Sequence, residues 1–188
     1  MKKEGKKIII IRGQSTAGKT TISHALAQAL PGWIFIDIWK IKEMFEPLGL
    51  EDRTVIKSAS KKAVMAVTKE VMEKIGTNII LQEADRNFLI KRLRSYLKKY
   101  NYKVYSFFLY VDYDIAIKRA KIREKPTMHI KNLFTRKEWE KNQLSSENGD
   151  LRINTAEHSM QETMEIILRE IGEKKRRHPK AHMIRKAW

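Results

Sequence analysis

Cysteine is absent from the sequence. Without thiols the chain can form neither a disulfide framework nor a thiolate metal site, and this absence fits a reducing compartment, so we expect a cytoplasmic protein. Long apolar runs are also missing. No run approaches the roughly 18 residues of a membrane helix, and the isoleucines at 8–11 are too few for the core of a signal peptide. We therefore expect no membrane partner.

Acidic residues are scarce relative to basic ones. The 188 residues contain 39 Lys and Arg against 22 Asp and Glu, which gives a formal net charge of +17. A strongly basic surface attracts polyanions such as nucleic acid, whereas a lysine-rich proteome produces the same total without any such function. Only the clustering of the charge separates the two interpretations. One cluster is visible at 173–188, where Glu173 is the only acidic residue, and we interpret this stretch as a basic C-terminal tail.

Apolar runs alternate with helical patterns along residues 1–172. We expect strands at 8–11, 33–38, 79–81, 104–111 and 151–154, with helices between them and after the last. This alternation predicts an α/β domain with a five-stranded, mostly parallel sheet and helices on both faces. Two helices have a predicted buried face. It consists of Val55, Ala59, Ala63, Val67, Val71 and Ile75 in the first, and of Met160, Met164, Ile167, Leu168 and Ile171 in the last.

A phosphate-binding loop follows the first strand. The stretch Gly13-x-x-x-x-Gly18-Lys19-Thr20 is a Walker A sequence between a strand and a helix. Its small residues allow successive backbone N–H groups to point at a phosphate chain, and the helix adds its positive N-terminal end. We expect ATP to bind through Gly13, Ser15, Thr16, Ala17, Gly18, Lys19, Thr20 and Thr21. Lys19 should reach the β- and γ-phosphates, the Thr20 hydroxyl should hold Mg²⁺, and Thr21 should lie near the α-phosphate.

The rest of the sequence narrows the class of nucleotide-binding protein. The chain contains no Asn-Lys-x-Asp guanine-reading motif and no Leu-Ser-Gly-Gly signature, and it is too short for a motor protein. A single short domain with this loop favours phosphoryl transfer to a small acceptor.

The second strand ends at Asp37. In a parallel sheet the carboxyl ends of the strands lie at one edge, so Asp37 should face the phosphate loop. A carboxylate there can accept the proton of the acceptor hydroxyl and orient its oxygen for in-line attack. The alternative is that Asp37 only caps the next helix. Trp39 and Lys40, just beyond it, are further candidates for acceptor binding, although packing is the favoured role of Trp39.

The third strand is followed by Glu83, Asp85 and Arg86. Glu83 or Asp85 could anchor a Mg²⁺-bound water or grip the acceptor at the same edge, and Arg86 could bind an anionic acceptor. Asp85 could instead cap the helix that follows. After the fourth strand, Arg119 and Arg123 lie one helical turn apart. Planar guanidinium groups suit the charge of a transferring phosphoryl group, and we expect a lid at about 122–136 that excludes water. The alternative is a solvated basic helix.

The stretch "IIIIRGQSTAGKTTISHALAQALPGWIFIDIWKIKEMFEPLG" resembles the chloramphenicol phosphotransferase-like kinases, whose wider relatives are zeta-toxin-like and polynucleotide 5′-hydroxyl kinases. The resemblance covers the loop Ser15–Thr20, Leu30-Pro31, Trp33 and Asp37, and "GDLRINTAEHSMQETMEII" is similar to the group's final strand and helix. Asn154 stands where the group has Asp. The resemblance implies a P-loop kinase fold in which Asp37 is the base and Arg119 and Arg123 grip phosphates.

These observations together predict an ATP- and Mg²⁺-dependent kinase that transfers the γ-phosphoryl group to a hydroxyl of a small molecule. A kinase for 5′-hydroxyl ends of RNA or DNA is the alternative, favoured by the charge and the tail. A nucleic-acid-binding ATPase that transfers nothing is a further alternative.

Overall fold

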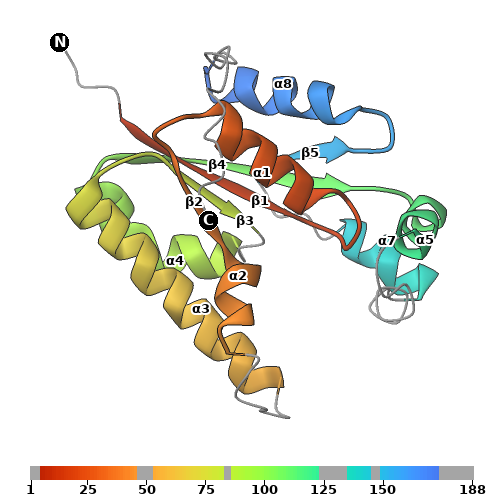
Figure 1. Cartoon of the computed structure of the whole chain (residues 1–188), viewed down its shortest axis with the longest axis horizontal. Helices are drawn as coiled ribbons and strands as arrows, with labels where there is room; N and C mark the ends of the chain where they lie inside the picture. The colour runs from red at the N-terminus through yellow and green to blue at the C-terminus, as the bar shows by residue number, and fades with distance from the viewer. Residues whose placement is uncertain (1–4, 46–52, 83–85, 123–134, 145–148, 174–188) are drawn as a thin grey trace, which may run out of the picture.

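The protein forms one parallel sheet in the computed structural model, which describes residues 5–45, 53–82, 86–122, 135–144 and 149–173. Five strands lie in the order β2-β3-β1-β4-β5, and every neighbouring pair is parallel. The strands are β1 (Lys6–Gly13), β2 (Ile34–Asp37), β3 (Ile79–Gln82), β4 (Tyr102–Tyr110) and β5 (Asp150–Asn154). The predicted fold class is confirmed (Figure 1).

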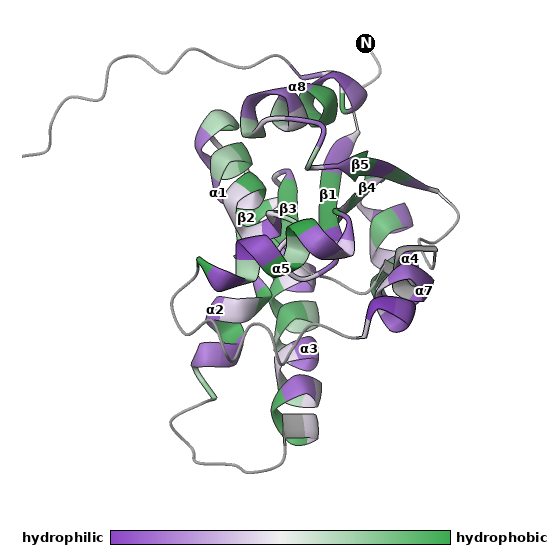
Figure 2. Cartoon of the chain, turned by 90° about the vertical axis from the view of Figure 1, so that its right-hand side faces the viewer, coloured by the Kyte–Doolittle hydropathy of each residue, from purple (hydrophilic) through white to green (hydrophobic). Residues whose placement is uncertain are grey.

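Helices cover the two faces of this sheet. Packed on one face are α1 (Lys19–Ala29) and α8 (Met160–Glu170), and on the other are α3 (Arg53–Glu70), the π-helical turn η2 (Val71–Ile75) and α4 (Arg86–Lys99). The short α2 (Ile38–Glu43) follows β2. Beyond the carboxyl end of β4 lie α5 (Tyr113–Lys121) and α7 (Arg136–Leu144), which Figure 2 shows from their own side. No helix in these described ranges is long and apolar enough to cross a membrane.

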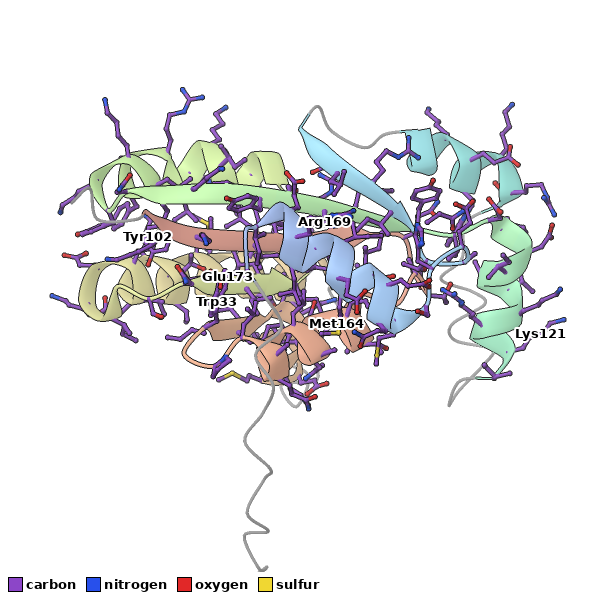
Figure 3. The ribbon with its side chains drawn as sticks, turned by 90° about the horizontal axis from the view of Figure 1, so that it is seen from above. Trp33, Tyr102, Lys121, Met164, Arg169 and Glu173 are labelled. Carbon is purple, nitrogen blue, oxygen red and sulfur yellow. The ribbon has the colours of Figure 1, made fainter. Side chains whose placement is uncertain are left out.

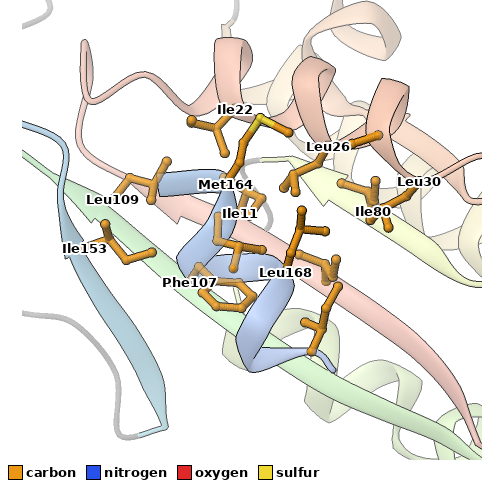
Figure 4. Close-up of a cluster of buried hydrophobic side chains, with 14 of the residues drawn as sticks. Ile11, Ile22, Leu26, Leu30, Ile80, Phe107, Leu109, Ile153, Met164 and Leu168 are labelled. Atoms are coloured by element: carbon orange, nitrogen blue, oxygen red, sulfur yellow. The ribbon is translucent and has the colours of Figure 1, made fainter. Parts of the chain in front are cut away.

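The isoleucine run of β1 forms the centre of the core. Ile9 and Ile11 pack toward α1 and α8 (Figure 4), whereas Ile8 and Ile10 pack toward α3 and α4. All four side chains are at most 1% exposed. A continuous apolar run is therefore explained by a strand that is covered on both faces.

The buried face predicted for the helix at 55–75 is wrong in part. Val55, Val67 and Ile75 are 50%, 44% and 60% exposed, and the buried side chains include Val64 and Met72 instead. A step of four residues exceeds the 3.6-residue turn, so a row of i+4 positions moves around the helix and leaves the buried side. The π-helical turn at Val71–Ile75 shifts the last residue further.

Met160 is likewise exposed, at 51%, although the rest of the predicted face of α8 is buried. It is the first residue of the helix. Side chains in a helix tilt toward its N-terminus, and the side chain of the first residue therefore projects past the helix end.

Candidate active site

The phosphate loop connects β1 to α1 through unusual backbone conformations. Gly13 has φ +137, Thr16 has φ +61 and Gly18 has φ +85. In the described part of the chain, Asn101 is the only other non-glycine residue with positive φ. A threonine in the left-handed backbone conformation raises the free energy of the fold by about 1–3 kcal/mol, and it persists only where the surroundings impose that conformation. Such alternation of backbone conformation turns successive N–H groups toward one point, which makes a concave site for an anion.

The loop ends in an open cradle at the start of α1. Gly18 caps the helix, no side chain caps it, and no acidic residue lies in its first turn. A Cβ atom built on Gly18 would meet nothing within 4 Å. Lys19 is 6% exposed, and its Nζ donates to the carbonyl oxygen of Gln14 at 2.7 Å. The backbone donors, the space and the cation all fit a phosphate chain.

Gln82 joins the end of β3 to this loop. It is in register with Ile11 of β1 and with Asp37 of β2, so three strand ends meet at one edge. Its Nε2 donates to Thr20 Oγ1 at 2.9 Å, while its Oε1 is buried with no hydrogen-bond partner in the described ranges. A hydroxyl beside an unpartnered amide oxygen is a donor set that suits hydrated Mg²⁺. The predicted metal residue Thr20 fits that ion, and Gln82 is a residue that our sequence reasoning missed.

Asp37 occupies the end of β2 and is 9% exposed. Its Oδ1 accepts a hydrogen bond from the N–H of Trp39 at 2.9 Å, so the capping role is confirmed. Its Oδ2 faces His24 Nε2 at 3.9 Å, which is too long for a hydrogen bond. The ring of His24 is held edge-on by Phe35, with 5.0 Å between centroids. Capping and proton acceptance can therefore use different oxygens of one carboxylate.

Arg119 braces the phosphate loop from α5. Its Nη1 donates to the carbonyl oxygen of Thr16 at 3.3 Å and to Thr155 Oγ1 at 3.0 Å, and its Nη2 donates to the carbonyl oxygen of Thr155 at 2.7 Å. Thr155 Oγ1 in turn donates to the carbonyl oxygen of Ala17 at 3.0 Å. The fork of the guanidinium thus ties the loop to the segment after β5. Contact of Arg119 with a transferring phosphoryl group stays a prediction.

A second brace comes from Gln14 inside the loop. Its Nε2 donates to the carbonyl oxygen of Trp139 in α7 at 3.0 Å, and its Oε1 accepts from the N–H of Val111 at 3.4 Å. Trp139 is 1% exposed and donates through Nε1 to the carbonyl oxygen of Val111 at 3.0 Å. Both braces fix a loop whose backbone geometry is strained.

Thr155→Val should lower the free energy of unfolding by about 1–3 kcal/mol, because it removes the hydrogen bond to the carbonyl of the buried Ala17 and one of the bonds that Arg119 donates. Thr163→Val is the matched control. Thr163 Oγ1 is also buried, but it has no hydrogen-bond partner in the described ranges, so its loss should be neutral or stabilising. Urea denaturation of both variants measures the difference. Equal effects of the two substitutions would contradict the bracing role of Thr155.

The remaining candidates lie at or beyond the limits of the described residues. Trp39 and Lys40 are exposed on α2, where Lys42 Nζ lies 4.3 Å from the ring centroid of Trp39 and Lys40 pairs with Glu43 at 3.1 Å. Their acceptor contacts stay predictions. Arg86 begins α4, but nothing is described of its side chain.

Other predicted features fall outside the described ranges altogether. These are Glu83, Asp85, Arg123, most of the lid at 122–136, and the tail beyond Glu173. Glu173 itself pairs with Lys7 Nζ at 2.8 Å.

The fold and the loop define a kinase-like P-loop protein. The family model described as Zeta toxin matches residues 1–184, so the chain belongs to the Zeta toxin family, and the resemblance to small P-loop kinases is confirmed. No protein of curated function matches the sequence.

Several solved structures share the fold. The tunicamycin resistance protein of Deinococcus radiodurans superposes with a TM-score of 0.63 at 20% identity, covering 90% of this chain and 97% of that chain. The Mycobacterium tuberculosis APS kinase CysC, solved with AMPPNP and APS, has a TM-score of 0.61 at 12% identity. The match covers 91% of this chain and 100% of that chain. A chain of the Pnkp1/Rnl/Hen1 RNA repair complex has a TM-score of 0.56 at 14% identity. The match covers 77% of this chain and 47% of that chain. At these identities the likeness shows the fold alone.

Proposed function

We propose that the protein transfers the γ-phosphoryl group of ATP to an alcohol hydroxyl. The observation that carries this proposal is the register of three strand ends, which brings the carboxylate of Asp37 to the same edge as Gln82 and the phosphate loop. Capping of α2 occupies only Oδ1 of Asp37, so Oδ2 can serve a second role at that edge. In-line transfer needs such a group on the far side of the γ-phosphate, where it orients the attacking oxygen.

Each residue of the site has a role in this reaction. The loop backbone and Lys19 bind the phosphates and hold the γ-phosphoryl group in position. Asp37 Oδ2 accepts the proton of the attacking hydroxyl, while the Oδ1 bond to Trp39 keeps the carboxylate in place. Thr20 and Gln82 would hold Mg²⁺, which when bound neutralises charge on the phosphate oxygens.

Two classes of acceptor are compatible with this site. A small hydroxylated molecule is supported by the sequence resemblance to antibiotic kinases, and two of the structural neighbours are named for tunicamycin resistance and for APS phosphorylation. A 5′-hydroxyl end of RNA or DNA is supported by the neighbour from an RNA repair complex. It is also supported by the distribution of basic residues over the surface, described below.

The test follows label from [γ-³²P]ATP. One set of reactions contains 5′-hydroxyl RNA and DNA oligonucleotides, and the other contains nucleosides, sugars and hydroxylated antibiotics. Label on any of these acceptors supports phosphoryl transfer and names the acceptor class. Release of inorganic phosphate without labelled acceptor, stimulated by nucleic acid, would contradict the proposal and favour the ATPase alternative.

A further inference from the structure

Among the helices that the structure describes, α3 and α4 on one side of the sheet contain most of the excess positive charge. On that side, α4 contains six basic residues and no acidic one, namely Arg86, Lys91, Arg92, Arg94, Lys98 and Lys99. Its neighbour α3 contains Arg53, Lys57, Lys61, Lys62 and Lys69 against Glu70. Long nitrogen-tipped side chains stand out from α4 in Figure 3.

The two helices on the opposite side contain little charge. In α8, Arg169 is the only basic residue, against Glu162, Glu165 and Glu170 in the same helix, and α1 contains Lys19 and no acidic residue. A merely lysine-rich composition spreads charge over all surfaces. The asymmetry between the two helix layers therefore favours a function for the basic side.

A hollow of about 370 Å³ lies between α3 and α4. We call it the α3–α4 groove, and it is lined by Lys62, Met65, Ala66, Lys69, Phe88 and Arg92. Its three cationic side chains form no ion pair with any described acidic residue. Met65, Ala66 and Phe88 add apolar groups, so the lining combines cationic and apolar side chains.

Phe88 is the aromatic element of the groove. The ring is partly exposed, with Arg92 Cζ at 4.7 Å and Lys61 Nζ at 5.1 Å from its centroid. Both cations lie over the ring in cation–π contacts, so a base that stacks on Phe88 would displace one of them toward its phosphate.

One side of the groove also follows the candidate active site closely along the sequence. Phe88 is in the first turn of α4, and α4 starts a few residues after Gln82, at the edge where the strands end. A strand held in the groove could thus place its end near Asp37.

We propose that the α3–α4 groove binds single-stranded nucleic acid and presents its 5′-hydroxyl end as the acceptor. The second half of this statement rests on the phosphoryl transfer proposed above, whereas binding itself does not. Lys62, Lys69 and Arg92 contact phosphates, and Phe88 stacks on a base.

The experiment measures fluorescence anisotropy of a labelled 5′-hydroxyl RNA of about 12 nucleotides, a length within the usual range of single-strand sites, and of DNA of the same sequence. The variant Lys62→Ala/Lys69→Ala/Arg92→Ala should weaken Kd about tenfold or more at physiological salt. The slope of log Kd against log salt should fall by about two, since each lost phosphate contact removes about 0.7. Phe88→Leu keeps an apolar side chain but removes the ring, and should weaken binding roughly tenfold.

The matched control removes three exposed basic residues from other elements, in Lys103→Ala/Lys137→Ala/Arg169→Ala. Its net charge equals that of the groove variant, so a non-specific attraction would weaken both alike. The inference predicts less than about a threefold change in the control. Equal weakening of the two triple variants, tighter binding to a duplex than to the single strand, or no binding by the parent protein would each overturn it.

Failure of this inference is distinguishable from failure of the proposed reaction. Asp37→Asn should lower the rate of transfer by about 10²- to 10⁴-fold and keep the affinity for RNA. The groove variant should leave the affinity for ATP unchanged, because no groove residue belongs to the phosphate loop. Transfer of label to a small molecule combined with no nucleic-acid binding would overturn the groove and keep the kinase.

Discussion

Asp37→Asn should lower kcat for phosphoryl transfer by about 10²- to 10⁴-fold, the usual contribution of a positioned general base. The substitution keeps the shape of the side chain, and asparagine caps helices as well as aspartate does, so the bond from the N–H of Trp39 and the fold should survive. Only the capacity of Oδ2 to accept a proton is lost. The affinity for ATP should therefore remain within about twofold, as measured by calorimetry beside single-turnover kinetics.

The control for this prediction is Asp112→Asn. Asp112 also precedes a helix, but it is exposed and its side chain makes no capping hydrogen bond. Its amide variant should transfer phosphate at the parent rate. If Asp37→Asn retained more than about a tenth of the parent kcat, Asp37 would be a structural cap and the acceptor would have to be activated elsewhere.

Gly13→Ala should cost about 4 kcal/mol of folding free energy or more, a large part of the stability of an ordinary single domain. A Cβ atom on Gly13 would stand 1.9 Å from the carbonyl oxygen of Leu109, and the residue has φ +137. The clash is with the backbone of the neighbouring strand β4, where Gln14 N–H already donates to the same oxygen at 3.1 Å. Neither side can move without breaking the pairing of β1 with β4.

Gly32→Ala separates the clash from the effect of positive φ. Gly32 also has positive φ, +85, but a Cβ there would meet nothing within 4 Å. Gly32→Ala should lower the free energy of unfolding by about 1 kcal/mol, the ordinary penalty for a side chain in this backbone region. Thermal unfolding by circular dichroism compares the two variants, and similar melting temperatures would show that the contact with Leu109 is relieved by small shifts.

The phosphate loop and the strands could be predicted because their signals are local. Four consecutive isoleucines indicate a buried strand, and the glycine and lysine spacing of the loop has one common structural meaning. The end of β2 was identified for the same reason, since Asp37 follows directly on an apolar run.

Gln82 and Thr155 could not be found in this way, because their importance depends on which strands are neighbours. The sequence does not specify that β3 lies between β1 and β2, and that order is what brings Gln82 beside Thr20. Thr155 contacts Ala17 across 138 positions of the chain. Arg119 was identified, but its observed contacts are with backbone carbonyls of the loop, which no motif specifies.

The central place of β1 has a consequence for synthesis on the ribosome. Its first strand partner, β3, follows 71 positions later in the chain, as the bond from Lys7 N–H to Asn78 shows. At about 5–20 residues per second, the isoleucine run emerges several seconds before any strand exists to pair with it. An unpaired β-branched run of this kind is a site of aggregation. The nascent chain therefore has a defined interval in which a chaperone must shield residues 8–11 or the growing α1 must cover them.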